Sequence, residues 1–350
     1  MTTPFGDFGA PPDAVSWAAL VLAAAIFVGS VGKTKNLDLE RHLRERPRLL
    51  LVFVVALALS AFALSLGYVA YYLRGGPRIV DATSYFLQAR ALAEGHVRFD
   101  IPSPSGSFRG RFLLPSDDGH ALSVIFPPGY PAVLALGFLA HAPMLVGPAI
   151  AAALVIATAA LAHRLFENAR VSLLAAALST VCAVLRYHTA DTMSHGWSAL
   201  LLAVTLVAAT SGTGAVAAGV AASSGTGGVA AGVAGFSAGA LVATRPLSGA
   251  VALTLALLVA WRSRRRAFVT LLAAAPPILL FLLEQRAVTG TFGSTQLAYY
   301  ALADGPPGCF RYGFGQGIGC VFEHGDFVRA HLAHGYGMSA ALGTTLRRFK

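Results

Sequence analysis

Long apolar runs and short polar segments alternate along the chain. The apolar runs cover residues 14–31, 49–72, 132–166, 171–185, 196–210, 228–244, 247–261 and 267–283. A helix needs about 20 residues to cross the hydrocarbon layer of a bilayer. The pattern therefore predicts eight membrane-spanning helices, with 132–166 divided by a break near His141 into a short interfacial piece and a full helix from Met144.

One long polar interval, residues 79–131, interrupts the apolar runs in the first two thirds of the chain. It begins with Ile79-Val80-Asp81-Ala82-Thr83-Ser84-Tyr85 and ends with Phe126-Pro127-Pro128-Gly129-Tyr130-Pro131. Because the neighbouring runs have membrane length, an aqueous site served by them is expected in this interval. Asp81 is its first acidic residue and the candidate for the centre of that site.

Composition narrows the fold class to an all-α polytopic membrane protein. The 350 residues are 56% hydrophobic and 12% charged, about half the charged fraction of an average soluble domain. The net charge of +10 comes from Arg and Lys gathered in short segments between apolar runs, as in positive-inside loops. We therefore interpret the charge as a topology signal, with a lipid bilayer and no nucleic acid as partner.

Two basic segments, 32–48 and 262–266, predict the topology. Each is placed on the cytoplasmic side by its Arg and Lys residues, and counting spans from the first to the second gives the same side. The amino terminus lacks a basic leader, so its apolar run is expected to stay as a membrane helix. Three parts follow: 1–48, a membrane domain 49–283 with an outer loop 73–131, and an outer segment 284–350.

The last third of the chain carries three further features. A small-residue segment starting at Ser211 recurs with one change at 224–234, which predicts a loose loop or close helix approach. Cys309 and Cys320 share the outer segment, so they are expected to form a disulfide in an oxidising compartment, whereas Cys182 lies in an apolar run. No apolar run follows Leu283, and 340–350 resembles the start of a helix, so we expect the sequence to be incomplete.

Asp81 has two compatible interpretations. Asp is a favoured N-cap, and residues 82–94 have the pattern of an amphipathic helix that would lie along the membrane surface. A carboxylate at a helix N-terminus is also stabilised in its charged form and can face an aqueous cleft. The second interpretation makes Asp81 a catalytic group.

Asp117 and Asp118 precede Gly119 and His120 in a second polar segment of the outer loop. The sequence is typical of a turn, here before a short strand-like run. Two adjacent carboxylates are also candidate oxygen ligands for a divalent cation. This cation is the one cofactor that the sequence suggests. The nearby Pro127-Pro128-Gly129 predicts a rigid turn into the next membrane segment.

Two more polar groups interrupt apolar runs on the predicted outer face. The segment 187–195 contains His188, Asp191 and His195, and Arg245-Pro246 separates two later runs. Charged side chains in a bilayer are costly, so both groups are expected at helix ends that face a protein-lined cavity. Arg245 either extends to the membrane surface or pairs with an anionic group such as a phosphate.

Taken in order, these segments resemble the bacterial GT-C glycosyltransferases, which include protein O-mannosyltransferases, lipid A aminoarabinose transferases and RgtA/B/C/D-like transferases. The similarity covers roughly residue 49 to the end, and it rests on the order and membrane side of the motifs rather than on any single one. The matching positions are Asp81, Ser84, Tyr85, Gln88, Ala89, the segment 126–131, Met193-Ser194-His195, Arg245-Pro246 and Gly313-Phe314-Gly315.

The resemblance implies a GT-C-like transmembrane bundle whose first outer loop carries juxtamembrane helices. It implies inverting sugar transfer from a polyprenyl-phosphate donor to a lipid, glycan or protein acceptor, outside the bacterial inner membrane. Asp81 would be the catalytic base, with Arg245 and His188 or His195 at the phosphate, and Tyr85, Asp117 and Asp118 also binding substrate. Ala82 departs from the pattern, since many members have a second acid there, which Asp117 or Asp118 would have to supply.

A non-catalytic membrane protein or a transporter is the alternative interpretation. A transporter is expected to have related halves with broken helices that meet near the middle of the bilayer. The polar groups of this sequence gather instead on one predicted face, which favours an enzyme.

Overall fold

The computed structural model describes most of the chain and divides it into two compact units. The described residues are 21, 47–103, 110–211, 226–303, 314–318, 328–330 and 332–348. Unit 1 spans residues 1–99 and 127–284, and unit 2 spans 100–126 and 285–350. The predicted boundary after residue 283 lies next to the boundary between the two units at residues 284 and 285. The division into the three predicted parts stays a prediction.

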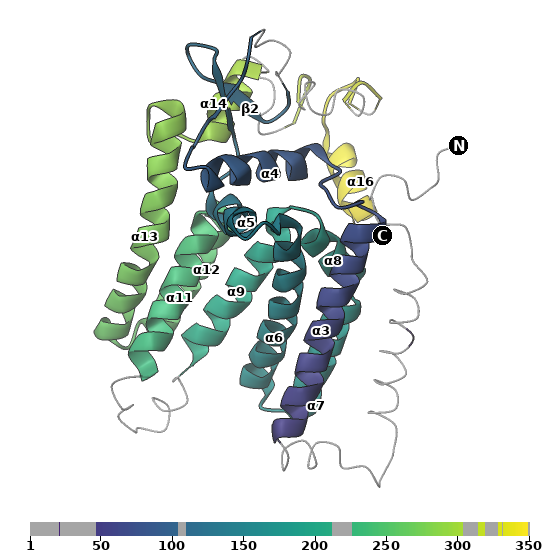
Figure 1. Cartoon of the computed structure of the whole chain (residues 1–350), viewed down its shortest axis with the longest axis vertical. Coiled ribbons are helices and arrows are strands. Elements are labelled where there is room, and N and C mark those ends of the chain that lie inside the picture. The colour runs from purple at the N-terminus through teal and green to yellow at the C-terminus, as the bar shows by residue number, and fades with distance from the viewer. Residues whose placement is uncertain are drawn as a thin grey trace. The chain divides into compact units, whose positions relative to one another are not determined.

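Unit 1 is a helical bundle (Figure 1). Helices α3, α6, α7, α9, α11 and α12 run side by side, and α4 crosses one end of the bundle. The bounds are α3 Pro47–Tyr71, α4 Val80–Ala93, α5 Gly129–Leu139, η2 Pro143–Leu145, α6 Val146–Phe166, α7 Ala169–Val181, α8 Ala183–Ala190, α9 Ser194–Thr210, α11 Thr226–Val242, α12 Pro246–Ala260 and α13 Arg264–Thr289, whose last residues belong to unit 2.

Several apolar helices indicate a multi-pass membrane protein. Among the described residues, three helical stretches are long and apolar enough to cross a membrane, namely Arg48–Tyr71, Pro143–Phe166 and Arg264–Thr289. A fourth span results if the bent pair α7 and α8 is taken together. Helices α9, α11 and α12 are apolar but shorter, and the first predicted span, 14–31, lies outside the described residues apart from one position. The total of eight spans therefore stays a prediction.

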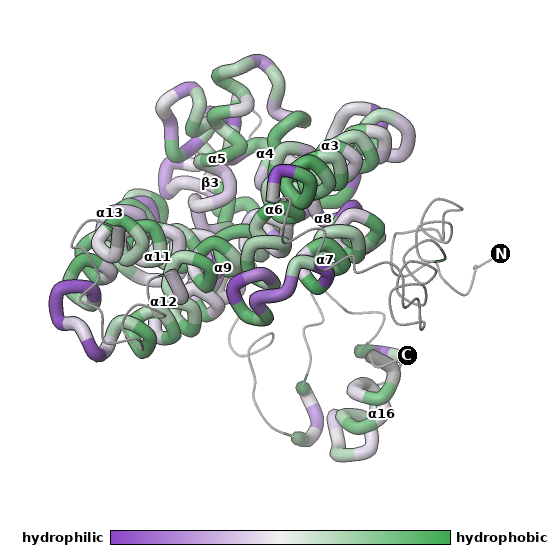
Figure 2. Tube along the Cα trace, turned by 90° about the horizontal axis from the view of Figure 1, so that it is seen from below, coloured by the Kyte–Doolittle hydropathy of each residue, from purple (hydrophilic) through white to green (hydrophobic). Residues whose placement is uncertain are grey.

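The bundle packs small residues inside and leaves large apolar residues on its surface. Ala58 of α3 packs with Ala151, Val155 and Ala176 of α6 and α7, while Leu59 of α3 is 64% exposed. Figure 2 shows hydrophobic colour along the bundle helices and hydrophilic colour at turns between them. Apolar side chains on the outside are stable in hydrocarbon, and small residues inside let helix backbones approach closely.

Helices α11 and α13 approach each other closely at two glycines. A Cβ atom added at Gly239 would meet the backbone of Ala274, and one added at Gly235 would meet the backbone of Thr270. The two glycines are four residues apart, so they lie on one face of α11. Both glycines lie just past the repeat copy at 224–234, so the expectation for the repeat itself stays a prediction.

Replacing Gly239 with valine is expected to destabilise the protein by about 1 to 3 kcal/mol, because the added side chain must push α13 away. The matched control is Gly228→Val in the same helix, where an added Cβ meets nothing within 4 Å. The measurement is the apparent melting temperature of each purified variant. If both variants lowered the melting temperature equally, the loss of stability would come from helix propensity and not from the contact between α11 and α13.

The chain between α7 and α9 corrects one sequence prediction. Residues 187–195 were predicted as an outer loop, but α8 extends to Ala190 and α9 begins at Ser194, which leaves a short turn. The break comes earlier, at Cys182, whose backbone is extended and where the two helices meet at 58°. Neither Gly nor Pro marks this bend in the sequence, so no local signal predicted it.

The structure is mostly helical, as predicted, but it also contains a small sheet that lies mainly in unit 2 and that an all-α fold class does not include. Strands β1 (Phe99–Asp100), β2 (Leu113–Pro115) and β3 (Ala121–Val124) lie in the order β1-β3-β2. β2 and β3 form an antiparallel hairpin in which Leu114 pairs with Ser123. The strand-like run after His120 is thus confirmed as a strand. Unit 2 also contains α14 (Thr295–Ala303) and α16 (Met338–Arg348), the latter at the predicted final helix.

Several predictions concern residues that the structure leaves out. Most of the basic segment 32–48 lies outside the described residues, as do Cys309, Cys320 and Gly313. The disulfide and the first basic loop therefore stay predictions. Cys182 is described and is a free, half-buried thiol in the bend between α7 and α8.

Candidate polar site at one end of the bundle

Helix α4 positions Asp81 differently from the N-cap interpretation. The N-cap residue is Ile79, whose side chain cannot accept a hydrogen bond, and Asp81 is the second residue of the helix. Its carboxylate still lies in the first turn, where the helix dipole favours a negative charge. The N-cap interpretation is therefore wrong for Asp81.

The face that α4 buries is also more polar than the sequence pattern indicated. Ser84 and Gln88 have polar side chains, but each residue is only 4% exposed. Gln88 donates from Nε2 to Glu284 Oε1 at 3.4 Å, so its partner comes from α13. Arg90 and Glu94 do face solvent and form an ion pair at 3.1 Å.

Two hydrogen bonds join α4 to the turn before α9. Thr192 donates from Oγ1 to the carbonyl oxygen of Ala82 at 2.8 Å, and Ala82 is fully buried. Tyr85 donates its hydroxyl to Ser194 Oγ at 3.1 Å. Burial raises the pKa of Tyr85, although this hydrogen bond and the charge of Arg245 oppose the shift. The phenol therefore stays protonated at neutral pH and remains a donor.

The Pro-Pro-Gly turn docks against the turn that carries Arg245. Gly129 donates its backbone N–H to the carbonyl oxygen of Ala243 at 2.8 Å, and a Cβ at Gly129 would collide with the backbone of Ala243. The next residue, Tyr130, packs edge-on against Tyr85 with ring centroids 5.7 Å apart. This motif thus has a structural role, because it brings α4, α5 and the α11–α12 turn together.

Arg245 is directed into the bundle. It is the N-cap residue of α12, and its Nε donates to Ser194 Oγ at 3.4 Å. Ser194 is fully buried, so the guanidinium lies against the start of α9. This position favours pairing with an anion at the bundle end over extension to the membrane surface.

His188 and His195 stack against each other beside Arg245. Their ring centroids are 4.3 Å apart with 23° between the planes. Arg245 is close enough for its positive charge to act on both imidazoles. Each ring has a buried Nδ1 atom without a hydrogen-bond partner among the described residues. The pair can therefore bind or transfer a proton to a ligand that enters the site.

Asp191 is the residue that the sequence analysis left out of the site. It is 1% exposed, and its Oδ1 accepts the backbone N–H of Thr192 at 2.9 Å, whereas Oδ2 has no partner among the described residues. Burial is the main cause that raises the pKa of Asp191 to about 6; the charge of Asp81 adds to the rise, and the Thr192 hydrogen bond opposes it. Two carboxylates that influence each other thus lie in unit 1.

The seven residues Asp81, Tyr85, His188, Asp191, Ser194, His195 and Arg245 form what we call the polar cluster. Five of them were candidates from sequence, and Asp191 and Ser194 are additions. The sequence does contain a signal for Asp191, which lies between two apolar runs and close to two histidines. A carboxylate in such a place costs free energy in a membrane and therefore usually marks a functional site. Its burial and its relation to Asp81 depend on how α4 packs.

Asp117 and Asp118 belong to unit 2, in the turn between β2 and β3. Both are exposed, and the Asp118 carboxylate accepts hydrogen bonds from Ser116 Oγ and from the backbone N–H of His120. These bonds lower the pKa of Asp118, led by the Ser116 contact. The turn prediction is confirmed, while a role of either residue in substrate binding stays a prediction.

Within the part of the chain that the structure describes, no group of three or more His, Cys, Asp or Glu side chains could hold a metal ion. No protein-family model, curated protein or solved structure matches this chain. The polar cluster and the motif resemblance are therefore the two features that point to a function.

Proposed function

We propose that this protein is an inverting GT-C-type glycosyltransferase of the bacterial inner membrane, with its site on the outer face. It transfers a sugar from a polyprenyl-phosphate donor to a lipid, glycan or protein acceptor. No nucleotide sugars are available outside the membrane, so the donor arrives within the bilayer. A site at the end of a membrane bundle suits such a donor.

The observation that carries this proposal is the joining of four separate motifs at one end of unit 1. Thr192 links the α8–α9 turn to Ala82, Ser194 is shared by Tyr85 and Arg245, and Gly129 docks beside Arg245 on Ala243. The sequence singled out these segments by their polar residues, their order and the membrane side predicted for them. Their common location supports a single active site.

The polar cluster contains the groups that the reaction needs. Asp81 would accept the proton of the acceptor hydroxyl. As it does so, the acceptor oxygen bonds to the anomeric carbon, and the bond from that carbon to the phosphate oxygen breaks. The electron pair of that bond leaves with the polyprenyl phosphate. Arg245 would stabilise the phosphate charge as it develops, with His188 and His195 next to it.

Ala82 is a packing position in this chain, because it is fully buried and its carbonyl accepts from Thr192. An acidic side chain there would be buried against the α8–α9 turn. Asp191, which comes from that same turn, would supply the second carboxylate of the site. Its charge and that of Asp81 would orient a donor whose phosphate is held by Arg245.

The raised pKa of Asp191 predicts an unusual dependence of stability on pH. The folded protein binds this proton more tightly than the unfolded chain, since the pKa rises from 3.8 to about 6. Its contribution to stability is thus fully present below pH 3.8 and is lost as the pH rises to about 6. Asp191→Asn is therefore expected to raise stability at pH 7 by up to about 3 kcal/mol, with little change at pH 4.

The measurement is the apparent melting temperature of the purified variant at pH 4 and pH 7. Asp117→Asn is the control, because it removes an exposed carboxylate from the turn between β2 and β3. A lower melting temperature for Asp191→Asn at pH 7 would contradict the burial of an unstabilised charge.

The proposal is tested by reconstituting the full chain in liposomes with a polyprenyl-phosphate-linked sugar and a mixture of membrane acceptors. The expected result is a glycosylated product of inverted anomeric configuration and release of polyprenyl phosphate, both absent without protein. Persistent failure of a stable, lipid-reconstituted protein to consume any polyprenyl-phosphate sugar would argue against it.

One observation favours the alternative, a transporter. The helix pair α7 and α8 is bent by 58°, and broken helices of this kind line binding sites in transporters. Here the polar cluster lies at the end of the bundle, where α9 and α12 begin. Uptake or release of a labelled sugar or its lipid carrier by liposomes, without any covalent transfer, would favour the transporter.

A further inference from the structure

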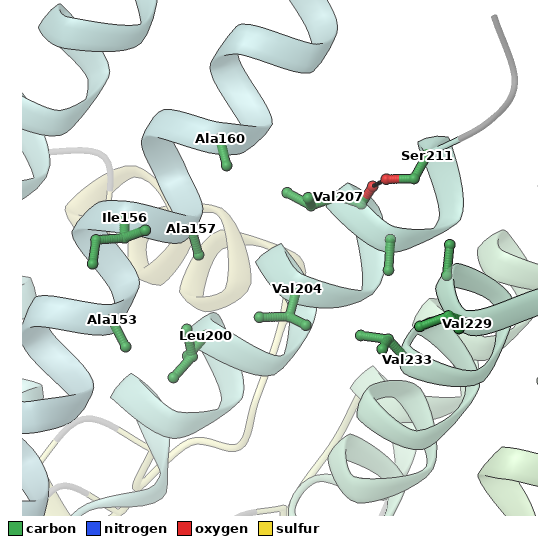
Figure 3. Close-up of a pocket in the computed structure, with 12 residues that line it drawn as sticks. Ala153, Ile156, Ala157, Ala160, Leu200, Val204, Val207, Ser211, Val229 and Val233 are labelled. Atoms are coloured by element: carbon green, nitrogen blue, oxygen red, sulfur yellow. Dashed lines mark hydrogen bonds between the residues drawn. The ribbon is translucent and has the colours of Figure 1, made fainter. Parts of the chain in front are cut away.

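An apolar cleft opens between α6, α9 and α11 (Figure 3). Its lining residues on α9 begin at Leu200, whereas the polar cluster lies at the start of that helix. Its volume is about 890 Å³, and its lining residues are Ala153, Ile156, Ala157, Ala160, Leu200, Val204, Val207, Ala208, Ser211, Val229, Ala230 and Val233. Ser211, just past the end of α9, is the one polar side chain of that lining. The cleft is therefore suited to a hydrocarbon chain.

The cleft opens on a face that the bilayer would cover. Ile156 is 47% exposed, Val233 is 42% exposed and Val229 is 69% exposed. Ile156 belongs to α6, which is long and apolar enough to cross a membrane. An unfilled cleft in hydrocarbon would lose dispersion contacts along its walls, so the favoured occupant is an acyl chain.

A cationic group stands at the polar end of the cleft. Arg266 donates from Nη2 to the carbonyl oxygens of Ser211 at 3.0 Å and of Ala209 at 3.2 Å. Its Nε atom is buried and has no hydrogen-bond partner among the described residues. Arg262, Arg264 and Arg265 are exposed next to it in the same basic segment. The cleft thus ends beside a concentration of positive charge.

We propose that this cleft binds an anionic phospholipid, with one acyl chain between α6, α9 and α11 and its phosphate at Arg266. Basic pockets between membrane helices on the cytoplasmic side attract anionic headgroups. The length of the apolar lining and the cation at its end match the two parts of such a lipid. The same cluster of arginines would repel a second copy of this chain docked at that position.

This lipid site is independent of the proposed sugar transfer, because none of its lining residues belongs to the polar cluster. Its expected role is structural. Helices α6 and α11 both pack against α9, and the lipid would fill the gap between them. The lipid would therefore add to stability in a membrane that contains anionic headgroups.

Native mass spectrometry of the purified full chain tests the proposal, with added phosphatidylglycerol or phosphatidylcholine of identical acyl chains. The wild-type protein is expected to retain phosphatidylglycerol in preference. Arg266→Gln should reduce that retention by about fivefold, the factor that corresponds to one basic side chain near an anionic headgroup. Arg48→Gln, an exposed arginine at the start of α3, is the control and should retain the lipid.

A second pair of variants tests the cleft without changing charge. Val233→Trp places a large side chain in the lining and is expected to abolish retention of the lipid. Leu255→Trp changes a similarly exposed residue of α12 outside the lining and should have no effect. Equal retention of both lipids by the wild-type protein, or unchanged retention in Val233→Trp, would overturn the proposal. The proposal would also be overturned if the wild-type protein were a dimer and Val233→Trp converted it to a monomer, because a second copy would then occupy the cleft.

Discussion

Asp81→Asn is expected to lower the turnover of sugar transfer by about 100-fold or more, the usual contribution of a general base. Asparagine has the same shape but cannot accept the acceptor proton. The substitution should leave the fold intact, because the N-cap of α4 is Ile79 and not Asp81. The measurement is the initial rate with a polyprenyl-phosphate sugar in liposomes, at matched protein content.

Glu94→Gln is the matched control for Asp81→Asn, since it removes an exposed carboxylate at the other end of the same helix. It should retain the wild-type rate. A wild-type rate in Asp81→Asn would remove Asp81 from the mechanism and leave Asp191, Asp117 and Asp118 as the carboxylates to test. A melting temperature equal to that of wild type shows that any loss is chemical.

Arg245→Gln is expected to lower turnover by about 100- to 1000-fold, the loss seen when a group that stabilises developing negative charge is removed. Glutamine can still hydrogen-bond to Ser194, but it has no charge for the departing phosphate. Arg245→Lys retains the charge and should recover part of the rate. The loss should appear in kcat more than in KM, because the phosphate charge increases as the bond breaks.

Arg90→Gln is the control for Arg245→Gln, because Arg90 is exposed on α4, where it pairs with Glu94 of the next turn. It should change the rate little, as surface ion pairs contribute little. Equal activity of Arg245→Gln and wild type would mean that Arg245 has only a structural role at the start of α12. A rise in KM alone would limit it to donor binding.

The helices could be predicted from sequence because apolar length is a local property. The runs that predicted α3, α6 and α13 correspond to helices that could cross a membrane, and the break near His141 separates α5 from α6 as expected. The turn at Asp118 followed from local chemistry too, since its side chain bonds to residues two positions away.

The bend at Cys182 and the polar burial of α4 could not be predicted in this way. No Gly or Pro marks the bend, and Gln88 is buried only because Glu284, far along the chain, provides a partner. The small sheet was missed for a related reason, since β1 and β2 each pair with β3 and neither is long enough to be recognised alone. Non-local contacts decide these features.

The sequence by itself determined that this chain has membrane-length helices, and that Asp81, His188, His195 and Arg245 lie in polar segments between apolar runs. Apolar periodicity and the cost of burying charge are enough for that. Only the tertiary structure decided which helix ends meet. Tyr85 and Arg245 both hydrogen-bond to Ser194, and Asp191 is buried close enough to Asp81 for the charge of Asp81 to raise its pKa. The environment of a carboxylate depends on the packing around it, because burial and neighbouring charges together set its proton affinity.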